Sequence, residues 1–237
     1  VEFAELFEDR QLSNDCKAAE KKLVKAASKV YKKFLASCPA PDAPGSKQVT
    51  ALMTITGLID APKADKEFLS INGAQGFSTF YGYYMLEAMA MAGNYQGALD
   101  VIREYWGAMI DLGATSFWED FDINWIPNAA PIDELVPEGK KDIHGDCGAY
   151  CYVGFRHSLC HGWASGPTSW LSRHILGVEV IEPGCRQVRI TPHLGDLQWV
   201  KGTFPTPYGE LQIYHEKQAN GNVISEVKAP KGVSVIK

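Results

Sequence analysis

Residues 197–214 have the sequence Leu-Gln-Trp-Val-Lys-Gly-Thr-Phe-Pro-Thr-Pro-Tyr-Gly-Glu-Leu-Gln-Ile-Tyr. Apolar and polar side chains alternate near both ends of this stretch, while Thr206, Pro207, Tyr208 and Gly209 form a turn signal between them. Alternation with a period of two places every second side chain on the same face of a strand. The stretch therefore predicts two strands separated by a tight turn.

The same alternating pattern continues on both sides of this stretch. It predicts five strands: Val188–Thr191, Leu197–Thr203, Gly209–Tyr214, Val223–Val227 and Val233–Ile236. Turn residues separate neighbouring strands, as in Asn220-Gly221-Asn222. Short strands at such close spacing are typical of a small antiparallel β-sandwich. We expect this domain to cover residues 178–237.

Before residue 178 the apolar residues recur at intervals of three and four, which is the period of a helix. Capping residue types at Ser13, Asn14 and Asp15 indicate where the first long helix begins. The predicted helices are Asp15–Leu35, Lys47–Leu58, Thr79–Ala92, Gln96–Leu112 and Trp170–Leu176. Helices joined by short loops suggest an α/α barrel, so the predicted fold class is α+β with a helical region at residues 1–177.

Composition excludes several broad classes of protein. The chain has 237 residues, 46% hydrophobic and 22% charged, with a net charge of −5. These values are typical of a folded globular protein, and the acidic balance argues against a nucleic-acid partner. No apolar run approaches the roughly 20 residues that span a bilayer, so we expect no membrane partner. The six cysteines are too scattered for a disulfide scaffold.

Two short segments could carry chemistry. The first is Gly113-Ala-Thr-Ser-Phe-Trp-Glu-Asp-Phe-Asp122, in which Glu119 lies between aromatic residues. Such surroundings can hold a carboxylate beside a sugar ring, although a helix-capping or ion-pairing glutamate would have the same sequence. The second segment places His161 and Trp163 beside a run of small residues. Tight helix packing with a hydrogen-bonded histidine is the alternative there.

A zinc site is a competing interpretation of the residues between these two segments. The residues of zinc-ligand type are His144, Cys147, Cys151, His157, Cys160 and His161. Their spacing is loose and matches no compact finger or ribbon. We therefore expect no metal and no cofactor.

Four segments together resemble glycoside hydrolase family 78, the bacterial α-L-rhamnosidases. Gly113–Glu119 is similar to the Gly-Ala-Thr-Thr-x-Trp-Glu segment of the family, and His161–Leu171 to its His-x-x-x-Gly helix ending in Trp-Leu. Pro183–His193 and Thr206–Gly209 resemble the start of its C-terminal sandwich. All four occur in the family's order and spacing. Two departures are Pro167, which must begin a turn or kink the helix, and a long stretch between Glu119 and His161.

The resemblance implies the C-terminal half of an (α/α)6 catalytic barrel followed by a β-sandwich. It implies removal of terminal α-L-rhamnose with inversion, with Glu119 as the general base and His161 as a substrate-binding residue. Because a sugar site also needs an aromatic face, we expect Trp118 or Trp163 to bind the substrate as well. It also places the general acid upstream of the Trp-Glu segment, in a motif that these residues lack. The chain is therefore expected to be inactive alone; the alternative is a non-catalytic carbohydrate-binding or interaction module.

Two further expectations concern assembly and location. Half a barrel would leave the inner faces of its helices uncovered, and this surface should favour a homodimer. The candidates for that surface are Tyr81, Tyr84, Met85, Leu86 and Met89. The chain lacks an initiator Met and a signal-peptide pattern, so we expect it to be excised from a longer protein. The compartment is unknown; a signal peptide on the parent chain would favour the periplasm or the exterior.

Overall fold

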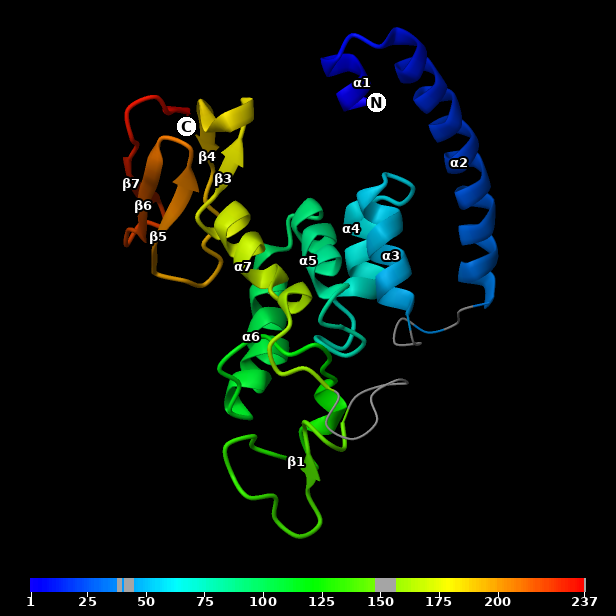
Figure 1. Ribbon diagram of the computed structural model, residues 1–237, viewed down its shortest axis with the longest axis vertical. Coiled ribbons are helices and arrows are strands. Elements are labelled where there is room, and N and C mark those ends of the chain that lie inside the picture. The colour runs from blue at the N-terminus through cyan, green and yellow to red at the C-terminus, as the bar shows by residue number, and fades with distance from the viewer. Residues whose placement is uncertain (38–39, 41–44, 148–156, 237) are drawn as a thin grey trace.

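A computed structural model describes residues 1–37, 40, 45–147 and 157–236, apart from a few side chains in the first two helices. Helices occupy the first three quarters of the chain and two small sheets the last quarter (Figure 1). The helices are α1 (Glu2–Leu6), α2 (Arg10–Ser37), α3 (Ser46–Ile55), α4 (Ala61–Ala64), α5 (Gly82–Met91), α6 (Tyr95–Asp111) and α7 (Gly166–Trp170). The predicted α+β class, with a helical region followed by a β-sandwich, is confirmed.

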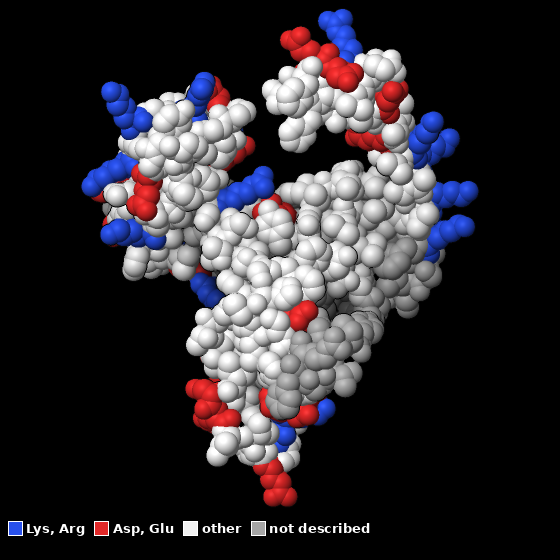
Figure 2. Space-filling model, in the orientation of Figure 1, with Lys and Arg blue, Asp and Glu red and all other residues white. Residues whose placement is uncertain are grey.

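Helix α2 begins earlier than the sequence predicted. Asp9 Oδ1 accepts a hydrogen bond from Leu12 N at 2.9 Å, so Asp9 acts as the capping residue in place of Ser13, Asn14 and Asp15. The first half of α2 projects beyond the other helices, and lysine side chains stand out along it (Figures 1 and 2). Most of the segment that joins α2 to α3 lies outside the described residues.

Helix α5 is the centre of the helical region and packs against α3, α6 and α7. Met85, Leu86 and Met89 are fully buried in this core. Trp170, also fully buried, donates from Nε1 to the Leu86 carbonyl at 3.0 Å. Full burial of a Leu or Met side chain stabilises the folded state by about 1.5–3 kcal/mol. The uncovered surface predicted for the homodimer is therefore wrong for these three residues, because the chain's own helices cover them.

The turn between α5 and α6 shows how the sequence ends one helix and begins another. Gly93 adopts φ +77°, a left-handed conformation that favours glycine and ends α5 as predicted. Asn94 begins the next helix, because its Oδ1 accepts from Gly97 N at 3.0 Å. Pro167 lies in the first turn of α7, so it begins this helix and does not interrupt it.

The last quarter of the chain forms two three-stranded sheets. Their strands are β3 (Val178–Val180), β4 (Gln187–Ile190), β5 (Trp199–Thr206), β6 (Gly209–Lys217), β7 (Val223–Lys228) and β8 (Ser234–Ile236). The strand orders are β3-β4-β8 and β5-β6-β7. The core between them includes Val188, Ile190, Leu211 and Ile213. One pair departs from the predicted antiparallel arrangement: β4 and β8 are parallel.

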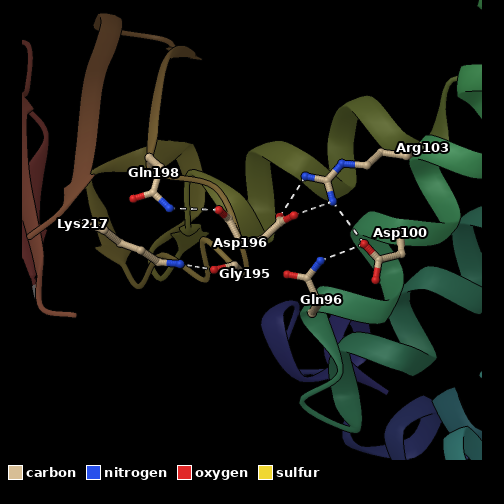
Figure 3. Close-up of polar contacts among 7 residues, drawn as sticks. All are labelled: Gln96, Asp100, Arg103, Gly195, Asp196, Gln198 and Lys217. Atoms are coloured by element: carbon tan, nitrogen blue, oxygen red, sulfur yellow. Dashed lines mark hydrogen bonds and ion pairs between the residues drawn. The ribbon is translucent and has the colours of Figure 1, made fainter. Parts of the chain in front are cut away.

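The sandwich is fixed to the helices by a polar junction (Figure 3). Arg103 of α6 donates to both carboxylate oxygens of Asp196, at 2.8 and 3.0 Å. Lys217 of β6 donates to the Gly195 carbonyl in the same loop. Beside them, the rings of Tyr95 and His193 stack with centroids 3.7 Å apart. Exposed ion pairs contribute little by themselves, so the stacked and buried groups carry more of the junction's stability.

A buried histidine makes this junction sensitive to acid. Fully buried His215 lies 3.1 Å from the Leu176 carbonyl through Nε2 and 2.7 Å from Ser225 Oγ through Nδ1. Burial lowers the pKa of His215, and the Leu176 carbonyl only partly opposes this. Burial and the neighbouring His174 also lower the pKa of His193.

We expect the free energy of unfolding to fall as the pH drops below about 6.5, the ordinary histidine pKa. A lowered pKa in the folded state means that the unfolded chain binds protons first, so the stabilisation is complete above pH 6.5 and is lost on acidification. Urea midpoints between pH 7.5 and 5.5 measure this, with His215→Gln as the comparison. A midpoint that stays constant across this range would contradict the prediction.

The described helices include none that is both long enough and apolar enough to cross a membrane. Charged side chains in this view gather on α2, around the sandwich and at the tip of the 130–146 loop (Figure 2). Few are visible across the central helices.

Candidate active site

Two extended segments, far apart in the sequence, pair beside α5 and form the candidate site. Glu119 N donates to the Ser158 carbonyl at 2.8 Å, and His161 N donates to the Phe117 carbonyl at 2.7 Å. His161 has an extended backbone and precedes the short 3-10 helix Gly162–Ala164, so it does not lie within a helix as the resemblance suggested. The pairing brings Glu119 and His161 to the same place although 42 positions separate them in the sequence.

The carboxylate of Glu119 is held in one orientation. Its Oε2 accepts from Ser158 N at 3.0 Å and lies 3.9 Å from Nδ1 of His161. The Glu119 side chain is 14% exposed and that of His161 is 33% exposed, so both are accessible yet constrained. A fixed, partly buried carboxylate beside a histidine can accept a proton from a water molecule or hydrogen-bond a sugar hydroxyl.

The backbone of Glu119 is held as firmly as its side chain. Its carbonyl oxygen accepts from Thr79 Oγ1 and from Trp163 Nε1, both at 2.6 Å. Thr79 lies three residues before α5 and Trp163 two residues after His161, so two separate segments hold this residue. Thr79 and Ser158 were not among the predicted site residues, because their roles depend on contacts between distant parts of the chain.

Trp163 forms the aromatic wall of the site. Its ring lies 4.2 Å from that of His161 at 42°, and its other neighbour is Phe80 at 5.8 Å. Phe80 in turn contacts Tyr84 at 5.9 Å. Trp163 is 44% exposed and Phe80 41% exposed, so both rings are accessible to solvent. We call Phe80, Tyr84 and Trp163 the aromatic rim.

The aromatic rim also borders an open cleft of about 870 Å³ between the helices and the sandwich. Tyr83 and Ser169 line its helical side, while Val180 and Phe204 line its sheet side. Ligand sites commonly lie where two structural units meet. The cleft begins at Trp163, next to the candidate carboxylate.

Trp118 does not lie where the sequence placed it. It is fully buried and its ring packs edge-on against Phe121 at 5.9 Å, within the core of the helical region. The alternation of an extended segment explains this: Glu119 faces the surface, so the preceding residue faces inward. Trp118 therefore has no exposed surface to offer a substrate in this structure, whereas Trp163 is 44% exposed beside His161.

Asp120, a second acidic residue, and the buried His157 lie next to the segment that carries Glu119. Asp120 N donates to Nε2 of His157 at 3.0 Å, and His157 Nδ1 lies 3.1 Å from the Ile143 carbonyl. A ring that accepts at Nε2 must carry its proton on Nδ1, which then donates to Ile143. Burial raises the pKa of Asp120, and the charges of Asp122 and Glu119 add to this, against the Phe121 amide and His157.

His157 appeared in the sequence only as a candidate zinc ligand, and its structural role is different. Among the described residues there is no group of three or more His, Cys, Asp or Glu side chains that could hold a metal. Burial raises the pKa of the Cys147 thiol, which disfavours the thiolate that a metal would need. Cys151 of the zinc interpretation lies outside the described residues.

The C-terminal part of the chain matches a known domain family. Residues 177–236 match the family model described as the bacterial alpha-L-rhamnosidase C-terminal domain. No curated protein sequence matches the chain.

Solved structures extend the likeness into the helices. The glycoside hydrolase family 78 rhamnosidase of Bacillus sp. GL1 covers 80% of this chain at 26% identity, with a TM-score of 0.60. An α-L-rhamnosidase from Aspergillus terreus covers 80% at 20% identity and a TM-score of 0.59. That from Streptomyces avermitilis, complexed with L-rhamnose, covers 80% at 19% identity and 0.55. The two more distant likenesses concern the fold alone.

The aligned part amounts to 18%, 21% and 17% of those three chains, so this chain spans about a fifth of their length. The likeness runs through both the helices and the sandwich, because the covered share exceeds the matched C-terminal domain. Residues 177–236 thus match the C-terminal domain of the bacterial α-L-rhamnosidases, and the chain as a whole is similar to part of the solved rhamnosidases, among them one of glycoside hydrolase family 78.

Proposed function

We propose that this chain supplies the general base and part of the sugar pocket of an inverting α-L-rhamnosidase. Glu119 is the base, His161 contacts the sugar and Trp163 forms the wall. One observation carries the proposal: the Glu119 carboxylate is fixed by Ser158 N, with His161 at 3.9 Å and an exposed indole beside them. A capping or ion-pairing glutamate, the alternative from sequence, would need neither the histidine nor the aromatic wall.

In the proposed reaction Glu119 takes a proton from water as the water oxygen attacks the anomeric carbon. The bond to the leaving oxygen breaks on the opposite face, and a general acid gives that oxygen a proton. The family resemblance assigns this acid to a segment upstream of the Trp-Glu segment. The Streptomyces avermitilis structure is complexed with L-rhamnose, which supports rhamnose as the sugar.

The proposal divides the chain into two structural units. Residues 1–177 form part of the catalytic (α/α)6 barrel, and residues 178–237 form the sandwich. The start of β3 at Val178 and the separate core of the sheets support this division. The aromatic rim then borders the cleft in which the rest of the glycoside would lie.

We expect the isolated chain to release no measurable nitrophenol from an aryl α-L-rhamnoside. Without the acid, leaving-group protonation is lost, and general acid catalysis contributes about 10²–10⁴-fold. Much of the pocket that positions the sugar is missing as well. The same assay on the complete enzyme that contains this chain provides the positive control. Robust turnover by residues 1–237 alone would show that the acid lies within them and that this assignment of roles is wrong.

A further inference from the structure

The outward face of the sheet β5-β6-β7 is an aromatic and polar surface that the proposed reaction does not use. Side chains alternate along most of β6: Leu211, Ile213 and His215 are buried, while Gln212 and Glu216 are exposed. The pairing register aligns the outward residues in three rows across the sheet. The rows are Trp199–Glu216–Ile224, Lys201–Tyr214–Glu226 and Thr203–Gln212–Lys228. We call these nine residues the outer sheet face.

The outer sheet face lies on the far side of the sandwich from the central helices, with β3 and β4 between them (Figure 1). It is hollowed rather than flat, and an open depression of about 840 Å³ covers it. Trp199, Lys201, Tyr214, Glu226 and Lys228 line the depression. That volume is in the range of small-ligand sites.

Two aromatic rings form the floor of the depression at one end. Trp199 is 61% exposed, and its ring lies 6.5 Å from that of Tyr214 with planes inclined by only 30°. Neighbouring rings at this small angle make a shallow continuous platform. Leaving an indole so exposed forgoes the large gain of burying it, which a ligand would restore.

The charges around the platform restrict the kind of ligand. Lys201 and Lys228 are balanced by Glu216 and Glu226, so the outer sheet face has no net charge. A polyanion such as nucleic acid or a uronic-acid polymer would be repelled by the two carboxylates that lie among the two ammonium groups. A neutral ligand with many hydroxyl groups can instead use donors and acceptors of both kinds.

We propose that the outer sheet face binds a neutral oligosaccharide. One pyranose ring stacks on Trp199 and Tyr214, and the hydroxyls of the following sugars bond to Gln212, Glu226 and the two lysines. The site would hold the chain on a polysaccharide independently of Glu119. This proposal therefore does not depend on the catalytic one.

Affinity electrophoresis of the chain tests the proposal, with hydroxyethylcellulose, xyloglucan and galactomannan as neutral probes and polygalacturonate as the anionic comparison. We expect at least one neutral polymer to retard the chain and polygalacturonate to have no such effect. Trp199→Ala should weaken binding by about 30-fold or more, as for a central aromatic contact, while Trp199→Phe keeps part of it.

Two control variants show whether retardation depends on the outer sheet face in particular. Phe3→Ala removes an aromatic that is 77% exposed on α1 and should leave retardation unchanged. Glu119→Gln should also be retarded normally, even though it is expected to lower kcat in the complete enzyme. Retardation by none of the neutral polymers, or equal retardation of the Trp199→Ala variant, overturns the proposal. Self-association that Trp199→Ala disrupts would also overturn it, because a second copy would then be the occupant.

Discussion

Replacing Glu119 with Gln in the complete enzyme that contains this chain is expected to lower kcat by about 10²–10⁴-fold. Glutamine has nearly the same shape, and its Oε1 can still accept the hydrogen bond from Ser158 N. It cannot take a proton from the attacking water. The loss should therefore appear in kcat while the variant folds normally, as measured by nitrophenol release and by urea denaturation.

Glu104→Gln is the matched control for this variant. Glu104 on α6 also accepts a backbone amide through Oε2, from Ala74 N at 2.9 Å, but it lies outside the candidate site. We expect its kcat to stay within about twofold of the original value, since a neutral amide preserves that contact. The two variants should also differ in the pH dependence of kcat. A variant without the general base loses the fall in kcat at low pH, whereas Glu104→Gln should keep it. Full activity of the Glu119→Gln enzyme would exclude Glu119 as the base.

Sequence periodicity predicted the sheets better than the helix ends. All five predicted strands occur with small shifts, because alternating side chains and Gly, Pro and Asn turns act locally. Within the sandwich, strand β3 was missed; it has only three residues, too few to establish a period. Helix α2 began early because Asp9 caps it, and several capping residues in succession made that choice ambiguous.

The site could be predicted only in part, for a physical reason. Glu119, His161 and Trp163 were identified because segments resembling a family carry them. Ser158, Thr79 and His157 hold Glu119 and Asp120 through bonds that join residues about 40 positions apart. No local pattern records such contacts. The burial of Trp118 likewise depends on which face of the segment meets α5.

The junction between helices and sandwich should be the part of the chain most sensitive to a single added methyl group. Gly177 follows the last helical turn at φ +72°, and its carbonyl accepts from Thr191 N at 2.9 Å. A Cβ at this position would lie 2.3 Å from the Thr191 carbonyl carbon and 2.5 Å from Pro192 N. Both neighbours are backbone atoms, which cannot rotate away as a side chain would.

Gly177→Ala is accordingly expected to lower the free energy of unfolding by about 2–5 kcal/mol. Of this, about 1–2 kcal/mol comes from the left-handed backbone conformation and about 1–3 kcal/mol from the displaced backbone. Gly93→Ala is the matched control, because it has φ +77° but nothing within 4 Å of the added Cβ. It should show the conformational cost alone. Urea denaturation, monitored by near-ultraviolet circular dichroism, gives the free energy of unfolding of both variants. Equal losses would mean that the sandwich can shift freely on the helices, and that the close approach at Thr191 does not hold the two parts together.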